Sequence, residues 1–129
     1  MDLDSFTGGY NRAYAVVNIE AVRRNILKSR EFLPENTGII AVIKTDAYGH
    51  GAAKVADAVK DITAGFAVAT IDEAVELREA GITSHIIVLG YISPREYVAA
   101  IEHDIILSMF DYKQACALSE LAGAMGKCG

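Results

Sequence analysis

Runs of apolar residues alternate along the chain with segments in which apolar residues recur every three or four positions. Four of the runs have the length of a strand and no polar alternation, as in strands of a parallel sheet that are buried on both faces. They are the segments 38–44, 66–69, 86–89 and 105–107. Because each is followed by a segment with helical spacing, the sequence predicts four βα units in series.

Capping residues predict where the helices begin. Thr70 and Glu73 have the spacing of a capping box, and Ser93 with Pro94 behind it marks a second helix start. Asn18 is a good N-cap for an opening helix, and residues 14–17 before it are expected to form a strand.

The predicted domain occupies residues 13–129, behind a flexible leader at residues 1–12. Repeated βα units form either an open doubly wound sheet or a closed barrel, and periodicity does not choose between them. A closed (β/α)8 barrel takes about 250 residues, roughly twice this chain, so a barrel would be represented here by its first half. The strand at 105–107 would then be an open edge.

Composition limits the partners and the compartment. Twelve Lys and Arg against 17 Asp and Glu give a net charge of −5, so neither nucleic acid nor a membrane surface is an expected partner. No apolar run approaches the roughly 18 residues of a membrane span. Cys116 and Cys128 are expected to be free thiols of a cytoplasmic protein. His85 and His103 are isolated, so no metal site is predicted, and helix acids such as Glu73 are interpreted as solvated surface.

Lys44 ends the most hydrophobic strand, at the sheet edge where ligands of parallel α/β proteins bind. A lysine that is partly removed from water there can react as a neutral amine with an aldehyde. Tyr48, in the turn that follows, could place its hydroxyl beside an anionic group near a helix N-terminus. Position alone leaves two alternatives open: a lysine that extends into solvent, and a tyrosine that bonds only to a neighbour.

The segment 41–52, Ala-Val-Ile-Lys-Thr-Asp-Ala-Tyr-Gly-His-Gly-Ala, resembles the pyridoxal phosphate (PLP) attachment segment of the alanine racemase family. The family pattern is an apolar strand, Lys, two variable residues and Ala-Tyr-Gly-His-Gly. Thr45 and Asp46 replace the commoner Ala-Asn pair at the variable positions. The resemblance covers about residues 13–127 and implies an α/β fold, the first half of a TIM-type (β/α)8 barrel that binds PLP. Further similar segments are 65–70, 73–82, 87–90 and 100–104.

The resemblance also implies roles for individual residues. Lys44 is expected to form the Schiff base with PLP and to act as the acid and base on one face of the substrate Cα. Tyr48 is expected to hydrogen-bond the cofactor phosphate, and Val42 and Leu89 to line the cofactor pocket. His50 is interpreted as a residue of the turn that makes local hydrogen bonds and carries no proton.

The family reaction interconverts L- and D-alanine for cell-wall precursors, with a small amino acid as substrate and a homodimer as the complete enzyme. Its second proton carrier is a tyrosine from a C-terminal β-domain of the other subunit. The later barrel strands and this β-domain are outside the 129-residue sequence, so the chain alone is expected to have little or no racemase activity.

Three alternatives stay open. Serine, lysine and broad-specificity racemases are similar through this segment, so the substrate could differ within the same enzyme class. A non-catalytic half-barrel that binds a cofactor or a partner is a second reading. Single-domain PLP homeostasis proteins and amino acid decarboxylases are a third, against which the Ala-Tyr-Gly-His-Gly string at residues 47–51 argues.

Overall fold

A parallel sheet forms the centre of the molecule. The computed structural model describes residues 15–127, and the predicted leader at 1–12 therefore lies outside the described residues. The strands are β1 (Ile40–Val42), β2 (Gly65–Val68), β3 (His85–Val88) and β4 (Ile106–Leu107). They lie in the order β1-β2-β3-β4, and all three neighbouring pairs are parallel. This consecutive order is that of a barrel, because a doubly wound sheet reverses its strand order at a switch point.

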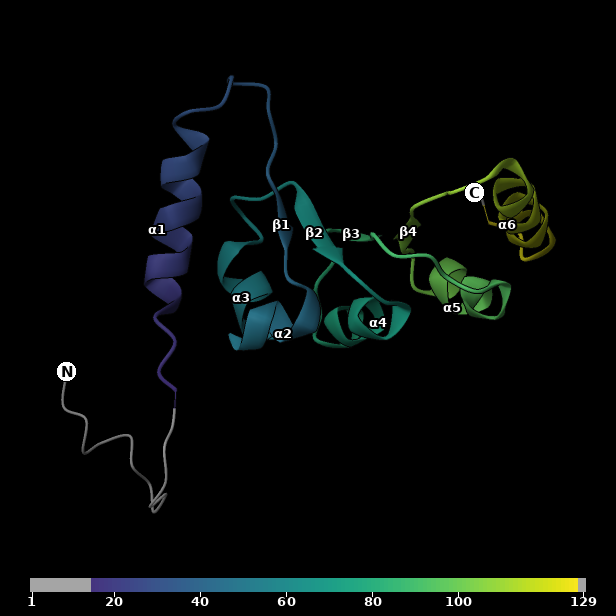
Figure 1. Ribbon diagram of the computed structural model, residues 1–129, viewed down its shortest axis with the longest axis horizontal. Coiled ribbons are helices and arrows are strands. Elements are labelled where there is room, and N and C mark those ends of the chain that lie inside the picture. The colour runs from purple at the N-terminus through teal and green to yellow at the C-terminus, as the bar shows by residue number, and fades with distance from the viewer. Residues whose placement is uncertain (1–14, 128–129) are drawn as a thin grey trace, which may run out of the picture.

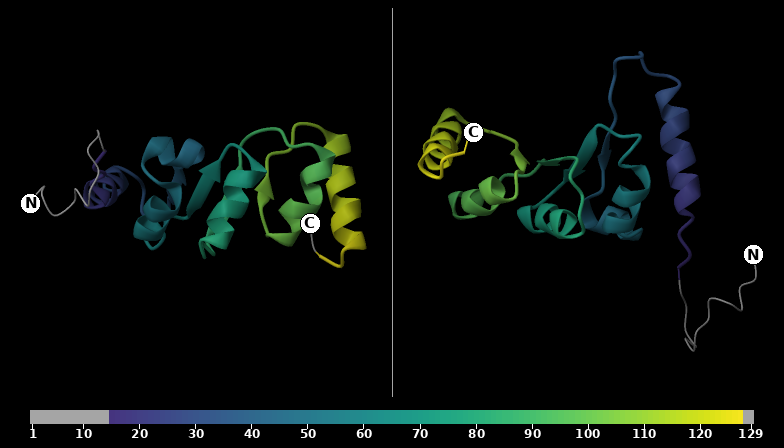
Figure 2. Two further views of the ribbon diagram at one scale, coloured as in Figure 1. Left: turned by 90° about the horizontal axis from the view of Figure 1, so that it is seen from below. Right: turned by 180° about the vertical axis from the view of Figure 1, so that it is seen from behind.

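Helices connect the strands and pack along one face of the sheet (Figures 1 and 2). The elements follow a curved path from α1 at one end to α6 at the other. The helical elements are α1 (Ile19–Arg30), α2 (Lys44–Gly49), α3 (Ala52–Val59), α4 (Ile71–Glu79), a 3-10 turn η2 (Pro94–Glu96), α5 (Tyr97–Glu102) and α6 (Tyr112–Ala124).

The two faces of the sheet differ in burial, most clearly at the outer strands. Phe66, Val68, Ile86 and Val88 face the helices and are fully buried in the core. The register places Val42, Ala67, Ile87 and Ile106 in one row on the opposite face. In that row Val42 is 42% exposed and Ile106 is 44% exposed, whereas the small side chain of Ala67 on the central strand β2 is buried. The prediction that the strand at 38–44 is buried on both faces is therefore wrong, because no layer of the described chain covers the second face.

The predicted caps form as the sequence indicates. Asn18 accepts a hydrogen bond from the first turn of α1, and Thr70 with Glu73 forms a capping box at α4. Ser93 and Glu96 form another, and the helix predicted there begins as the turn η2. The strand predicted at 14–17 is wrong for its described part, since residues 15–17 pair with no strand of the sheet.

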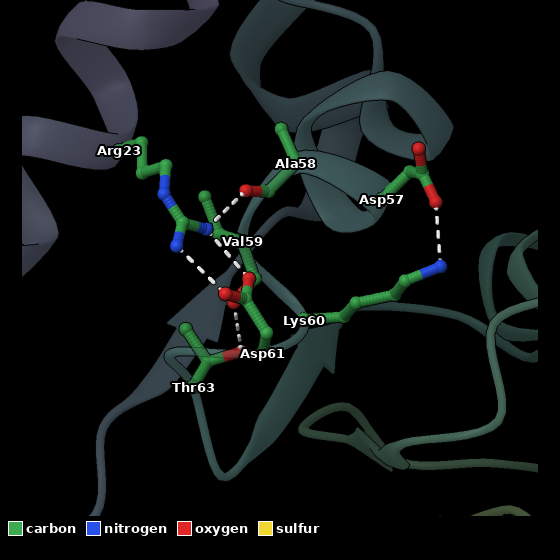
Figure 3. Close-up of polar contacts among 7 residues, drawn as sticks. All are labelled: Arg23, Asp57, Ala58, Val59, Lys60, Asp61 and Thr63. Carbon is green, nitrogen blue, oxygen red and sulfur yellow. Dashed lines mark hydrogen bonds and ion pairs between the residues drawn. The ribbon is translucent and has the colours of Figure 1, made fainter.

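An ion pair attaches α1 to α3. The guanidinium of Arg23 donates to both carboxylate oxygens of Asp61, at 2.5 and 2.6 Å, and to the carbonyl of Ala58 at 2.8 Å (Figure 3). The hydrogen bond from Arg23 lowers the pKa of Asp61, and the same contact raises the pKa of Arg23. A second pair, Lys60 with Asp57 at 2.7 Å, lies within the α3 region.

Arg78 connects the end of α4 to two loops. Its guanidinium donates to four backbone carbonyls at 2.7 to 2.9 Å, and its partial burial lowers its pKa. The acceptors belong to Ile82, Ser84, His103 and Asp104. The Arg78 side chain thus holds the loop before β3 and the loop before β4 in place through hydrogen bonds to their carbonyls.

Residues 15–127 contain neither a membrane-spanning helix nor a cluster of metal-ligating side chains. No helix in this range is long and apolar enough to cross a membrane. The same range contains no group of three or more His, Cys, Asp and Glu side chains that could hold a metal ion.

Candidate functional site

Lys44 lies where β1 leaves the sheet, at the carboxyl end of the strand. The residue before it still belongs to the ladder, because the Ile43 amide donates to the Ala67 carbonyl at 2.9 Å. Thr45 and the residues after it turn away from β2. Lys44 therefore occupies the edge of the sheet at which parallel α/β proteins bind ligands, as predicted.

The turn after Lys44 is a short left-handed helix, α2. Thr45, Asp46, Ala47 and Tyr48 all have φ between 52° and 57°. The first residue of this run is β-branched, and L-residues in this conformation cost about 1–2 kcal/mol each. The sequence predicts a tight turn here but not its hand. Such a run persists only when surrounding groups hold it in place.

Asp46 supplies one of these holding contacts. Its Oδ1 accepts a hydrogen bond of 2.6 Å from the Ala52 amide, at the first residue of α3. Gly51 occupies the N-cap of α3 and has no side chain that could cap it. The Asp46 carboxylate performs that task, and its negative charge is favoured at a helix N-terminus.

Glu73 supplies the second contact. One carboxylate oxygen accepts from the Thr45 amide at 2.6 Å, and the other accepts from the Ala69 amide at 2.8 Å. The sequence predicts that Glu73 caps α4. It otherwise indicates a solvent-exposed surface acid with no contact to the Lys44 turn. The contact with Thr45 spans 28 residues and leaves no local pattern, so sequence reasoning misses it.

The side chains of Lys44 and Tyr48 lie together. The Lys44 Nζ is 5.6 Å from the centroid of the Tyr48 ring, a distance that permits a favourable cation–π contact. Lys44 is half-buried, while Tyr48 is 61% exposed. The residues from 15 to 127 thus shield the amine from water only in part.

The two predicted apolar wall residues lie at different places on the same edge. Val42 lines a cavity of about 300 Å³ between α1 and β1, which Tyr48 and His50 also line. Leu89 follows β3, on the far side of β2, and is 47% exposed. The ring nitrogen Nδ1 of His50 is 2.8 Å from the Ala47 carbonyl, in agreement with the local role predicted for it. The structure therefore brings Lys44, Tyr48 and Val42 together and leaves Leu89 two strands away.

Residues 17–128 match the family described as alanine racemase, N-terminal domain. The chain belongs to the alanine racemase family. This match confirms the resemblance seen in residues 41–52, and the parallel sheet with its helices confirms the α/β half-barrel as the N-terminal portion of the family fold.

Individual members of the alanine racemase family show the extent of the likeness. The alanine racemase of Desulforamulus reducens is 39% identical over 115 residues, which are 88% of this chain and 31% of that protein. The solved alanine racemase of Clostridium difficile 630 in complex with cycloserine superposes with a TM-score of 0.83 at 33% identity, covering 88% of this chain and 32% of the other.

A racemase with another named substrate is also similar. The histidine racemase of Leuconostoc mesenteroides subsp. sake superposes with a TM-score of 0.74 at 30% identity, over 84% of this chain and 29% of the other. The chain spans between about a quarter and a third of the length of the curated alanine racemases that it matches, from 26% to 31%.

Proposed function

We propose that this chain is the cofactor-binding segment of a PLP-dependent amino acid racemase whose substrate is alanine. The observation that carries the proposal is the Lys44 amine, placed at the carboxyl end of β1 with the Tyr48 ring 5.6 Å away. Family membership supports the reaction class, and the position of Lys44 supports its role within it.

The residues at this edge fit the chemical groups of PLP. Lys44 offers a primary amine for the aldehyde, and Tyr48 offers an exposed hydroxyl that can donate to a phosphate. Val42 and Leu89 are exposed apolar side chains that could pack beside an aromatic ring. We therefore assign these four residues to cofactor binding, with Lys44 as the catalytic residue.

The reaction requires a proton to leave the substrate Cα and return on the other face. PLP, when bound, supplies the electron sink that makes this Cα proton acidic. Lys44 would hold the cofactor through its Nζ and, once freed by the incoming amino acid, would carry the Cα proton on that nitrogen for one face. Tyr48 would orient the cofactor by donating to its phosphate, and Val42 with Leu89 would exclude water from the ring.

A second proton carrier is needed on the opposite face of Cα. Val42 and Leu89 cannot carry a proton, and Tyr48 is assigned to the phosphate. We propose that this carrier comes from the C-terminal β-domain of a partner subunit, which makes the complete enzyme a homodimer. We further propose that this homodimer is cytoplasmic and that its product serves cell-wall synthesis. The 129-residue chain alone should then show no racemase turnover above background in a polarimetric or coupled assay. Turnover close to that of a complete enzyme would contradict this division of roles.

Borohydride trapping tests the role of Lys44. The chain is incubated with PLP, reduced, digested and analysed by mass spectrometry for the labelled lysine. Label should concentrate on Lys44, disappear from that peptide in Lys44→Ala, and persist in Lys54→Ala, the matched control at an exposed position of α3. Label spread evenly over the exposed lysines would refute the proposed site and favour a non-catalytic half-barrel.

The role of Tyr48 has its own test. Loss of a hydrogen bond to a charged group costs about 1.5–3 kcal/mol, so Tyr48→Phe should weaken PLP binding by about tenfold or more. Fluorescence titration with PLP measures the Kd, and Tyr112→Phe, at another exposed tyrosine, is the control. Equal Kd values for the two variants would remove Tyr48 from the phosphate site.

The similarity to a histidine racemase makes substrate a question for experiment. An amino acid that enters the site frees Lys44 and protects it from reductive labelling. L-Alanine should protect at a lower concentration than L-serine, L-lysine or L-histidine. Protection by one of the larger amino acids at the lowest concentration would keep the racemase assignment and change the substrate.

A further inference from the structure

The backbone on both sides of Lys44 is held by hydrogen bonds, but by two different devices. On its N-terminal side, the Ile43 amide is bonded to Ala67 in the regular ladder between β1 and β2. On its C-terminal side, the chain leaves the ladder and the Thr45 amide has no strand to pair with. A side chain from α4 takes over at that point, because Glu73 accepts the Thr45 amide at 2.6 Å.

The Glu73 carboxylate uses both oxygens, and each bonds a different segment. Oε1 accepts from the residue after Lys44, whereas Oε2 accepts from Ala69 at 2.8 Å and from Thr70 at 3.4 Å, at the junction of β2 with α4. Hydrogen bonds from amides to an ionised carboxylate are roughly twice as strong as those between neutral groups. The carboxylate therefore joins the lysine turn to the neighbouring βα junction.

This connection acts on a backbone that is strained. The residues from Thr45 to Tyr48 have positive φ, a conformation that L-residues leave unless they are held. The Thr45 nitrogen is bonded to the Lys44 carbonyl carbon, so a fixed Thr45 amide also fixes the orientation of the Lys44 peptide. Small displacements of a reacting group from its productive geometry reduce the reaction rate steeply.

We infer that Glu73 is a positioning residue for Lys44, through a carboxylate bridge that bonds the Thr45 amide with one oxygen and the Ala69 amide with the other. The inference rests on the proposed function, because the bridge matters for the reaction only if the Lys44 amine is the group that binds PLP. Glu73 is not itself a catalytic residue, since its contacts are with backbone amides.

Glu73→Gln is the decisive variant, because the side chain keeps its length and has only one acceptor oxygen for two amides. Thr70→Ala is the matched control: it removes the other half of the capping box, the 3.3 Å bond from the Glu73 amide to the Thr70 hydroxyl, and leaves the bridge intact. Glu76→Gln makes the same charge change at an exposed position of α4. If Glu73→Gln does not fold, Glu73→Asp, which is one methylene shorter, takes its place.

Amide hydrogen exchange measured by NMR reports the bridge without any cofactor. The Thr45 amide should exchange about tenfold faster in Glu73→Gln than in wild type, and at the wild-type rate in Glu76→Gln. In Thr70→Ala, amides of α4 should exchange faster while the Thr45 amide stays protected. Equal Thr45 exchange in Glu73→Gln and Thr70→Ala would overturn the inference and reduce Glu73 to a helix cap.

Borohydride trapping with PLP then separates the two proposals. The share of label on Lys44 should fall several-fold in Glu73→Gln and stay unchanged in Thr70→Ala. Unchanged Lys44 labelling in Glu73→Gln, with faster Thr45 exchange, overturns the link between the bridge and lysine reactivity. Absence of Lys44 label in the wild-type chain refutes the proposed function itself, while the exchange result still shows whether Glu73 holds the turn.

Discussion

Replacement of Thr45 by glycine should make the protein more stable, although it removes a whole side chain. Thr45 is exposed and has φ of 55°. Its amide bonds to Glu73, but its hydroxyl makes no hydrogen bond to another residue of the described chain. The substitution therefore removes an exposed side chain and no side-chain hydrogen bond, and it leaves the backbone amide in place.

The expected gain follows from two opposing terms. A left-handed conformation costs an L-residue about 1–2 kcal/mol, and glycine does not have this cost. Glycine loses more conformational entropy on folding, which takes back about 0.5–1 kcal/mol. The net increase in the free energy of unfolding should be about 0.5–1 kcal/mol. With a urea slope of about 2 kcal/mol per molar, the midpoint should rise by about 0.25–0.5 M.

Two neighbours provide matched comparisons for this urea titration, followed by circular dichroism. Ala47→Gly relieves the same strain at φ of 52° but loses a buried methyl worth about 0.8 kcal/mol, so its midpoint should hardly change. Gly49→Ala adds a methyl at φ of 82° with no atom within 4 Å, so it should lower stability by about 1 kcal/mol through the backbone alone. A lower midpoint for Thr45→Gly at unchanged slope would refute the left-handed assignment of this turn.

Three further predictions concern the rest of the fold. Arg78→Met leaves four carbonyls without their donor and should lower the free energy of unfolding by about 3 kcal/mol, measured in the same titration. The buried hydroxyl of Tyr97 has no hydrogen-bond partner within residues 15–127, so Tyr97→Phe should unfold at an equal or higher urea concentration. Burial raises the Tyr97 pKa above 10.0, so above that pH the wild type should lose stability relative to the variant as Tyr97 of the unfolded chain ionises. Arg23 lowers the Asp61 pKa below 3.8. The stability that this pair contributes is therefore present above pH 3.8 and is lost as the pH falls through the lowered pKa. Asp61→Asn should be less stable than wild type at neutral pH and equal to it in acid.

Local signals account for the parts of the fold that the sequence predicts well. Asn18, Thr70 with Glu73, and Ser93 with Glu96 cap helices because the donors they satisfy lie within three residues of them. The four apolar runs predict the strands, and only the observed strand order selects the barrel arrangement over the doubly wound one.

What the sequence does not predict depends on distant residues. The apolar run at 38–44 indicates two buried faces, but burial depends on which layers are present, and β1 has a covered side and an open side. The left-handed path of Thr45 and Asp46 has little signature in residue type, since neither is glycine and only Asp46 is of a type that visits this conformation occasionally. The residues that hold this path include Glu73, which the chain brings close only when β2 and α4 have formed.

At the candidate site, the motif around Lys44 identifies Lys44 and Tyr48 but not the contacts that hold them in place. Lys44 and Tyr48 are four positions apart, and the spacing of about 3.6 residues per turn puts them on one side of α2 whichever its hand. The pairing of Val42 with Tyr48 around one cavity requires α1 to pack on α3 beside β1, which no short motif encodes.

The left-handed turn after β1 is the mirror image of an ordinary helical turn, and this has a consequence for chemical synthesis. An amino acid of inverted chirality prefers the very φ and ψ that Thr45 adopts. A ligated chain that carries D-serine at this exposed position should therefore fold at least as stably as one with L-serine, an inversion of the penalty that D-residues impose on right-handed helices.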